Sequence, residues 1–353
     1  MRVLFLSDTH LGFDEPARPR IVRRRRGADF FGGYLRALAP AFAGEVDVVL
    51  HGGDLLYRSR VPASLVERAL APLRRVADRG IHVMIVPGNH ERGRIPYPLL
   101  ARHPRLHLFD RPRTVTLAAG GTRVAFTGFP YAREVRRRFP ELLAAAEADR
   151  DAPGPVDHAI LCVHQAVEGA TCGPGDFTFT TGDDVIRRAD LPSRSALVLS
   201  GHIHRHQVLR RAGSPAVVYA GSTERTSFAE APETKGYVRL DLGARAVSRL
   251  DFVPLEARPM AIRVVSLTGV APDEARRRVA AALAETPADA VVQLRALGAA
   301  GPSTDWLTAA LLRDLAGERD VHLVPSWDRH APHSAPDATA APIPDPQLPL
   351  VFG

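Results

Sequence analysis

The segment VLSGHIHRHQ, residues 198–207, joins an apolar run to three histidines at alternate positions. The run ends at Gly201, and His202, His204 and His206 follow. A short run that is apolar throughout is typical of a strand buried on both faces. Side chains two positions apart in an extended segment point to the same side. The segment therefore predicts a buried strand whose end presents two neighbouring imidazoles to a ligand.

Four other apolar runs end in a similar way. They are residues 3–6, 46–50, 83–86 and 159–163, and they lead into SDTH (7–10), GGD (52–54), GNH (88–90) and His164. Helical patterns at 30–42 and 64–78 separate the first three runs, which predicts strand–helix–strand units with right-handed crossovers. In such α/β sheets the carboxyl ends of the strands border one crevice, so we expect the polar residues to meet there.

The remaining sequence predicts further strands and a second domain. Residues 114–128 read as a hairpin that turns at Gly120-Gly121, and 216–222, 236–242 and 249–255 look antiparallel. Strands at 262–267, 290–297 and 321–325, with helices at 272–283 and 305–315, predict a compact β-α-β-α-β unit. We therefore predict a large domain at 1–257, a small domain at 258–329 and a Pro/Ala-rich disordered tail at 330–353. The tail ends in LPLVF (348–352), which either docks on a partner or a sheet edge or is a frayed end.

Composition narrows the class of protein. The 353 residues are 45% hydrophobic, which is enough for a large core, and the net charge is +7. All but one of the 46 basic residues are arginine, the exception being Lys235, and arginine forks match phosphate oxygens. Two cysteines exclude a disulfide scaffold or a cysteine zinc site. The first apolar stretch is too short for a signal sequence and no run would span a membrane, so we expect a cytoplasmic protein.

The polar groups at the strand ends have the chemistry of metal ligands. They are Asp8, His10, Asp54, Asn89, His90, His164, His202 and His204. Oxygen and nitrogen donors without cysteine suit two borderline divalent ions such as manganese, iron or zinc better than magnesium. Two such ions can lower the pKa of a shared water and clamp a phosphoryl group. Each motif alone is weak evidence for a metal site, since GGD is usually a turn and a lone histidine usually belongs to the core. All five together in chain order argue for a site.

The five motifs resemble those of the calcineurin-like metallophosphoesterase superfamily, in the order SDTH, GGD, PGNH, LCVH and SGHIH. Within it, the SbcD-type branch, related to the meiotic-recombination-eleven repair nuclease, is the most similar. That likeness is carried by HLG (10–12), HQAVEG (164–169), GHIHRHQ (201–207) and YAGSTERTSFAE (219–230). The resemblance covers roughly residues 1–255. It implies an α/β fold with a four-layer core, two packed mixed β-sheets flanked by helices, and a small α+β cap that binds DNA.

The resemblance also implies a role for each site residue. Asp8, His10 and His204 would hold one ion, Asn89, His164 and His202 the other, and Asp54 would bridge both. His90 would contact the scissile phosphate and assist the leaving oxygen, and Asn89 would also touch substrate. We expect His51 and His206 to support the ligands without binding metal.

Two positions depart from the nuclease pattern. The third motif is GNHE, with Glu91 where nucleases have aspartate, and phosphoprotein phosphatases share GNHE. Tyr57 stands where nuclease relatives often carry histidine or aspartate, which leaves the strand preference open.

Arginine clusters offer phosphate contacts. Arg23, Arg24, Arg25 and Arg26 follow the first motif, where loops line the crevice, and Arg225 lies in the STERTSF stretch. We interpret these five as contacts to the DNA backbone, against the alternative of a solvated helix face. For Arg133 and for 136–138 we favour the solvated face.

The combined reading is a two-metal phosphodiesterase, an SbcD-like exonuclease or endonuclease of DNA repair. It would act through a metal-bridging hydroxide, with Mn²⁺ as the expected ion and Fe²⁺ or Zn²⁺ as alternatives. One alternative is a phosphatase or phosphodiesterase for nucleotides or phosphoproteins, and another is an inert DNA-end-binding scaffold. The implied partners are DNA, an SbcC-like ATPase and a second copy of the chain. Where the ATPase-binding helix is expected after the cap, this chain has a Pro-rich tail.

Overall fold

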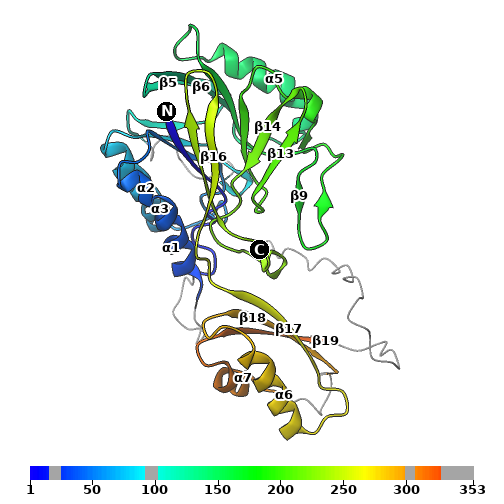
Figure 1. The fold of residues 1–353 in the computed structure, drawn as a ribbon. Helices are drawn as coiled ribbons and strands as arrows, with labels where there is room; N and C mark the ends of the chain where they lie inside the picture. Colours follow the sequence, from blue (N-terminus) through cyan, green and yellow to red (C-terminus); the bar gives the residue numbers. More distant parts are fainter. Residues whose placement is uncertain (16–24, 92–101, 299–306, 327–353) are drawn as a thin grey trace. The chain divides into compact units, whose positions relative to one another are not determined.

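The computed structural model describes residues 1–15, 25–91, 102–298 and 307–326 (Figure 1). The chain divides into two compact units. One comprises the described residues of Met1–Cys172 and Thr178–Arg258, and the other comprises Gly173–Phe177 with the described residues from Pro259 onward. Arg23, Arg24 and the LPLVF segment, with the predictions made for them, lie outside the described residues.

The first sheet of the larger unit has the order β16-β15-β1-β2-β3-β4. Its strands are β1 (Arg2–Leu6), β2 (Val48–His51), β3 (His82–Ile85), β4 (Leu106–Leu108), β15 (Gly236–Leu242) and β16 (Val247–Pro254). Strands β1 to β4 are parallel, whereas β15 and β16 add an antiparallel edge. The carboxyl ends of β1, β2 and β3 therefore point the same way.

The second sheet has the order β13-β14-β12-β7-β6-β5. Its strands are β5 (Arg113–Ala119), β6 (Thr122–Gly128), β7 (His158–His164), β12 (Leu197–Gly201), β13 (Gln207–Arg211) and β14 (Ser214–Tyr219). The predicted hairpin is present as β5 and β6. The strand predicted at 216–222 corresponds to β14. It is antiparallel to β13, as predicted, but it is parallel to its other neighbour, β12. The short ribbon of β8 (Ala166–Val167) and β11 (Val185–Ile186) completes the unit, and β9 (Thr171–Cys172) pairs with β10 (Phe177–Thr178).

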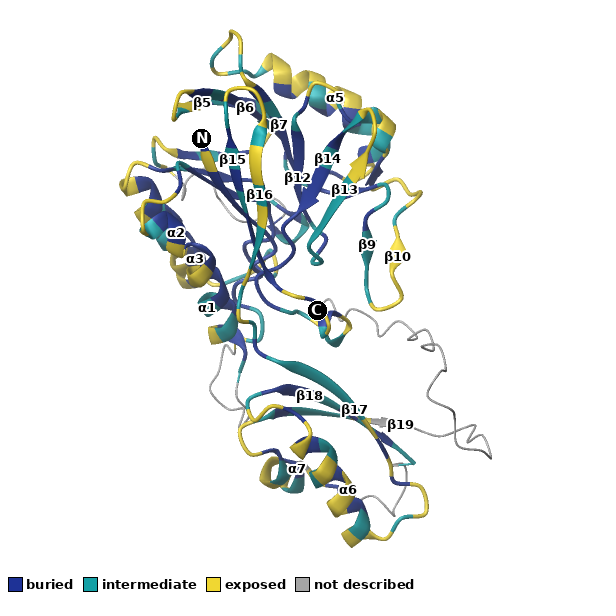
Figure 2. Ribbon diagram, in the orientation of Figure 1, coloured by how far each residue is buried: buried dark blue, intermediate teal, exposed yellow. Residues whose placement is uncertain are grey.

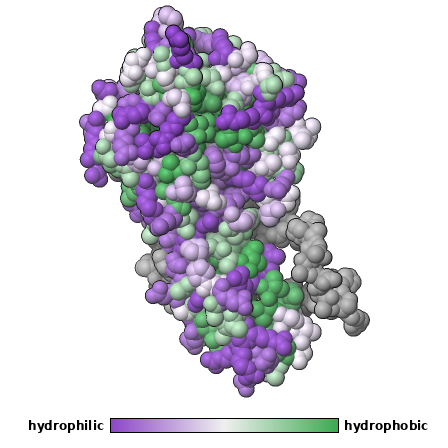
Figure 3. Space-filling view, in the orientation of Figure 1, coloured by the Kyte–Doolittle hydropathy of each residue, from purple (hydrophilic) through white to green (hydrophobic). Residues whose placement is uncertain are grey.

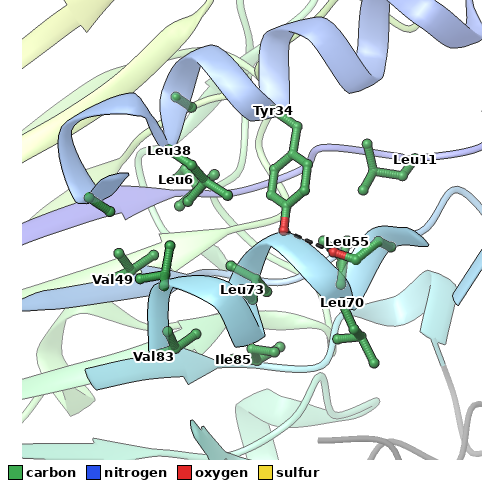
Figure 4. Packing of buried hydrophobic residues seen from close by; sticks show 14 of the residues in the cluster. Leu6, Leu11, Tyr34, Leu38, Val49, Leu55, Leu70, Leu73, Val83 and Ile85 are labelled. Carbon is green, nitrogen blue, oxygen red and sulfur yellow. Dashed lines mark hydrogen bonds between the residues drawn. The ribbon is translucent and has the colours of Figure 1, made fainter. Parts of the chain in front are cut away.

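Successive side chains of a buried strand point to opposite faces of its sheet, and each face packs against a different layer. In β1, Val3 and Phe5 pack in a cluster shared with the second sheet, whose members include Phe126 and Leu199. Leu4 and Leu6 point to the opposite face and pack under the helices, where Figure 4 shows Leu6. A third cluster covers the other face of the second sheet. The core is thus helix, sheet, sheet, helix, as predicted, and its central strands β1, β2, β7 and β12 are largely buried, whereas the edge strand β16 is partly exposed (Figure 2).

The outer layers are helices α1 (Gly27–Ala37), α2 (Ala39–Phe42) and α3 (Ala63–Asp78) on the first sheet and α5 (Val135–Ala148) on the second. The single helix predicted at 30–42 is two, because Pro40 lacks the N–H that a continuous helix would bond and α2 restarts after Leu38. Tyr34 of α1 is fully buried and donates its hydroxyl to the Ala69 carbonyl oxygen of α3 at 3.0 Å (Figure 4). This bond joins α1 to α3, two of the three helices that cover the first sheet.

The smaller unit is the predicted β-α-β-α-β arrangement. Its sheet has the order β17-β18-β19 with both pairings parallel, from β17 (Met260–Ser266), β18 (Val291–Leu297) and β19 (Asp320–Ser326). Helices α6 (Pro272–Ala284) and α7 (Ala309–Ala316) pack on the sheet around Val279, Leu283 and Leu294.

The surface carries few large hydrophobic side chains. On the face drawn in Figure 3, hydrophilic and hydrophobic residues are interspersed. Within the described ranges, the exposed large hydrophobic residues are Leu35, Phe177, Val264 and Val324. Among the helices of the described residues, none is both long and apolar enough to cross a membrane.

Candidate metal centre

The structure brings all eight predicted strand-end residues together. Asp8 and His10 follow β1, Asp54 follows β2, and Asn89 and His90 lie in a short 3-10 helix, η1 (Asn89–Glu91), after β3. His164 is the last residue of β7, and His202 and His204 follow β12. The two sheets are stacked with these ends at one edge, so five strands contribute to a single cluster.

One half of the cluster contains Asp8, His10 and His204. The Nε2 atoms of His10 and His204 lie 3.0 Å apart, and Asp8 Oδ1 is 3.9 Å from His204 Nε2. Asp54 Oδ2 is 4.0 Å from His10 Nε2. The candidate ligand atoms of Asp8, His10 and His204 all lie within 4.8 Å of one another.

The other half is formed around His164. Its Nε2 lies 3.4 Å from Asp54 Oδ2 and 3.1 Å from Asn89 Oδ1, and Asn89 Oδ1 is 3.0 Å from His202 Nδ1. Asp54 Oδ2 thus lies close to a histidine of each half. Its placement is that of a carboxylate between two cation sites.

His90 occupies a different position. Its Nδ1 contacts the Tyr57 carbonyl oxygen, and because a carbonyl can only accept, Nδ1 carries the hydrogen. Its Nε2 is 3.8 Å from Asp54 Oδ2, and its side chain is 28% exposed. The backbone N–H of His90 donates to Asp54 Oδ1 at 3.0 Å. His90 is therefore held at the edge of the cluster, with one ring nitrogen within 4.8 Å of the candidate ligand atoms of His10 and Asp54.

Four of the cluster residues have left-handed backbone conformations. The φ angles are 53° for Asp8, 44° for His10, 50° for Asp54 and 84° for His202. This region is uncommon for residues other than glycine, although Asp and His are enriched among the exceptions. The turns after the strands are thus shaped to aim these side chains inward.

Glycines allow the strand ends to approach one another. A Cβ on Gly88 would collide with the Asp54 carboxylate, and one on Gly53, whose φ is 108°, would collide with the His164 ring. The GGD and GNH sequences therefore serve close packing as well as turning.

Burial and mutual charge set the protonation of the cluster. Burial lowers the pKa of His202 to about 3 and also lowers that of His10 well below its ordinary value. Burial opposes protonation of His164 too, but the Asp54 carboxylate outweighs it and raises the pKa of His164 to about 9. Burial raises the pKa of Asp8, whereas for Asp54 His164 outweighs burial and lowers the pKa well below its usual range.

The donor set fits divalent cations. His164 Nδ1 donates to the Gly52 carbonyl oxygen at 2.8 Å, so without an added proton the Nε2 lone pair faces the oxygens of Asp54 and Asn89. Lone pairs that converge in this way repel unless a proton or a cation lies between them. The mixed nitrogen and oxygen donors, without cysteine, are those of borderline divalent ions.

A buried ion network behind His204 was not predicted from the sequence. Glu230 Oε1 accepts from His204 Nδ1 at 3.0 Å, which turns Nε2 toward the cluster. Glu230 Oε2 lies 2.6 Å from Lys235 Nζ, which also contacts Glu233 Oε2 at 2.8 Å and the His204 carbonyl oxygen at 3.0 Å. The Lys235 side chain is completely buried. The one feature of the sequence that could have indicated this network is that the only lysine of the chain, Lys235, belongs to it.

The predicted arginine contacts have internal partners. Arg25 pairs with Asp14 at 2.7 Å, and Arg26 is 3% exposed, with its guanidinium on the Arg225 carbonyl oxygen and near Glu224. Arg225 donates to the backbone oxygens of Glu230, Arg258 and Glu233. Because these guanidinium groups are engaged in holding loops together, we do not retain Arg25, Arg26 or Arg225 as DNA contacts.

Neighbouring residues support the ligands. His51 is buried, with Nε2 3.0 Å from Thr9 Oγ1, and His206 Nδ1 bonds the Tyr219 carbonyl oxygen at 2.7 Å. Glu91 accepts from the backbone N–H groups of Leu56 and Gly88. The glutamate of GNHE therefore ties together the turns that follow β2 and β3.

Comparison with known proteins gives a family match that includes the cluster. The family model described as calcineurin-like phosphoesterase matches residues 1–206, which contain all eight residues of the cluster. Among solved structures, TT1561 of Thermus thermophilus is similar over 72% of this chain and 98% of its own, at 14% identity and a TM-score of 0.47.

Curated relatives match most of the chain. The DNA double-strand break repair protein Mre11 of Haloferax volcanii is 32% identical over 305 residues, which are 84% of this chain and 62% of that protein. The SbcD component of the SbcCD nuclease of Bacillus subtilis is 25% identical over 268 residues, 68% of this chain and 66% of its own. The alignment thus spans just under two thirds of the Haloferax protein. Because the family model covers more than half of the sequence and includes the complete cluster, this chain belongs to the calcineurin-like phosphoesterase family.

Proposed function

We propose that the protein is a two-metal phosphodiesterase that cleaves DNA, as an exonuclease or endonuclease of DNA repair. The observation that carries the proposal is the convergence of seven nitrogen and oxygen donors, split into two halves about Asp54. The names of the relatives, a double-strand break repair protein and a component of a nuclease, favour DNA as the substrate. The net charge of +7 supports an anionic polymer.

In this proposal Asp8, His10 and His204 hold one divalent ion and Asn89, His164 and His202 the other, with Asp54 shared. The bound ions would supply charge neutralisation and an activated water for attack on phosphorus. Glu230 keeps His204 in the tautomer that presents Nε2 to the site, and the Gly52 carbonyl oxygen does the same for His164. These hydrogen bonds fix the ligands before substrate arrives.

His90 acts on the leaving oxygen. The Tyr57 carbonyl oxygen holds its Nδ1, so Nε2 is the nitrogen that faces the substrate. When protonated, Nε2 can hydrogen-bond a non-bridging oxygen of the phosphate and pass its proton to the departing 3′ or 5′ oxygen. Asp54 Oδ2 lies 3.8 Å from this nitrogen.

We propose Mn²⁺ as the working ion, with Fe²⁺ or Zn²⁺ as alternatives, because the donor set combines imidazoles with carboxylate and amide oxygens. We further propose that residues 258–329 position DNA, and that an SbcC-like ATPase and a second copy of the chain are partners. A cytoplasmic location stays a prediction.

The test is cleavage of linear double-stranded and single-stranded DNA with Mn²⁺, with Mg²⁺ alone in a parallel reaction. Wild type is compared with His90→Ala and Asp54→Ala, and bound metal is counted in each purified protein. We expect DNA cleavage by wild type, loss of cleavage in both variants, and loss of bound metal only in Asp54→Ala.

A small phosphate diester, bis(p-nitrophenyl) phosphate, separates the alternatives. If the diester is hydrolysed through His90 and Asp54 while DNA stays intact, the metal centre stands and the DNA assignment falls. If purified wild type takes up no metal and hydrolyses neither substrate, the proposal fails in favour of a binding scaffold.

A further inference from the structure

A pocket of about 600 Å³ opens directly beside the metal centre. It is lined by Ser59, Asn89, Tyr131, Arg133 and Asp184. Asn89 belongs to the candidate ligand set, and the Tyr131 ring centroid lies 5.6 Å from that of His202 and 6.2 Å from that of His164. The pocket is therefore continuous with the reaction site and has an aromatic ring at the junction.

The loop that carries Tyr131 and Arg133 is anchored on three sides. The Tyr131 N–H donates to the Pro87 carbonyl oxygen at 2.9 Å, in the segment that leads to Asn89. The carbonyl oxygen of Ala132 accepts from the buried Gln165 side chain at 2.9 Å, next to His164. The loop is thus fixed to the same two segments that carry Asn89 and His164.

Asp184 provides the third anchor. Its Oδ1 accepts from the Glu134 N–H at 2.6 Å, where Glu134 has a left-handed φ of 52°, and its Oδ2 lies 3.5 Å from the Tyr131 hydroxyl. The carboxylate is therefore used to hold the loop, which reduces its repulsion of an anion in the pocket.

Arg133 is presented by this anchored loop. Its side chain is exposed, and no carboxylate of the described residues pairs with its guanidinium. By contrast, its neighbour Arg137 pairs with Glu134, and Arg136 donates to the Gly182 carbonyl oxygen. A guanidinium that lines the same pocket as an aromatic ring, and that pairs with no carboxylate of the described residues, suits a phosphate joined to a nucleoside.

We propose that this pocket binds the nucleotide unit next to the scissile phosphate, with Tyr131 against its base or deoxyribose and Arg133 on the phosphate beyond. The inference rests on the proposed phosphodiesterase function and deepens it, because it assigns substrate contacts to residues other than the metal ligands. Ser59 adds a hydroxyl at the wall of the pocket. The site would therefore select nucleotides over simple phosphate esters.

The test measures binding to the Mn²⁺-loaded protein by calorimetry. The probes are inorganic phosphate, 2′-deoxyadenosine 5′-monophosphate and 2′-deoxyadenosine 3′,5′-bisphosphate. Wild type should bind the bisphosphate about tenfold more tightly than the monophosphate, which corresponds to one guanidinium–phosphate contact. Arg133→Gln should abolish that preference, whereas Arg245→Gln, an exposed arginine in the β15–β16 turn, should keep it.

Tyr131→Ala tests the aromatic contact separately. It should reduce the advantage of the monophosphate over inorganic phosphate about tenfold, since stacking on an aromatic ring is lost. Because each result is a ratio between two ligands on one folded variant, a general loss of metal or stability does not imitate it.

The inference is overturned if wild type does not distinguish the bisphosphate from the monophosphate, or if Arg133→Gln retains the preference. DNA cleavage by a protein with that result would leave the proposed function in place without the pocket. Conversely, the expected ratios together with intact DNA would support the pocket and redirect the enzyme to nucleotide substrates.

Discussion

Lys235 gives the sharpest test of how the centre is supported. Replacing it by methionine keeps most of the side-chain volume and removes the ammonium group. Glu230 and Glu233 would then lose a buried cation at 2.6 and 2.8 Å. We expect a loss of stability together with weaker metal binding, because Glu230 also orients His204.

The magnitude follows from the contacts. Breaking a buried ion pair by removing one partner costs about 3–5 kcal/mol. After the substitution Glu230 keeps its bonds to His204 and Thr226, and Glu233 keeps Arg205 at 3.1 Å. We therefore expect the lower value, about 3 kcal/mol. Arginine at 235 should recover only part of this, since its planar fork cannot place three donors around the point that Nζ occupies.

The assay is urea unfolding of the metal-free protein, compared with Arg239→Met. Arg239 lies in β15, which begins one residue after Lys235, and it pairs with the exposed Glu45 at 3.0 Å, so its loss should cost less than about 1 kcal/mol. A free energy of unfolding for Lys235→Met equal to that of Arg239→Met would refute the reasoning. So would full recovery of stability by Lys235→Arg.

Four further predictions concern the site, its support, pH and the core. His90→Ala should lower the cleavage rate about 10²- to 10⁴-fold while keeping both ions, so a variant that loses metal would contradict its placement outside the ligand set. Glu230→Ala should weaken Mn²⁺ binding about 10- to 100-fold in an electron paramagnetic resonance titration, and unchanged affinity would remove Glu230 as the group that orients His204. Burial, together with the neighbouring His82, lowers the pKa of His107 to about 4, so its contribution to stability is complete above about pH 6.5 and is lost as the pH falls toward 4. His107→Gln should therefore flatten the decline of the urea midpoint with falling pH in that window. If the variant and wild type decline with the same slope, His107 is not the group responsible. Phe126→Ala, at a fully buried position between the two sheets, should cost about 3–5 kcal/mol in the same unfolding assay, and a loss under about 1 kcal/mol would mean that the cluster repacks.

The fold and the cluster were predictable because both depend on local patterns. Runs such as Leu4–Leu6 and Val198–Leu199 are apolar throughout. A short run of this kind is typical of a strand that is covered on both faces. The polar residue after each run is then placed by the parallel sheet itself. The seven donors and His90 follow from that rule without knowledge of any side-chain contact.

What could not be predicted depends on contacts between distant segments. Glu230 meets His204 only because η3 (Phe228–Glu230), the 3-10 helix that follows β14, folds back toward the end of β12. Arg26 looked like a phosphate contact from its neighbours in sequence, yet it lies between Phe13, Phe30 and Glu224. Tyr131 belongs to no sequence pattern, and the arginines near Arg133 favour its interpretation as part of a solvated face. The structure places both residues on a loop fixed beside Asn89.

The left-handed turns at Asp8, His10, Asp54 and His202 have a consequence for selection. Each such conformation costs about 1 kcal/mol or more relative to glycine. A library of this protein selected only for heat resistance should therefore accumulate replacements at these four positions before any others in the core. If aspartate and histidine are instead retained at these positions in a lineage under thermal selection, the activity itself must also be under selection.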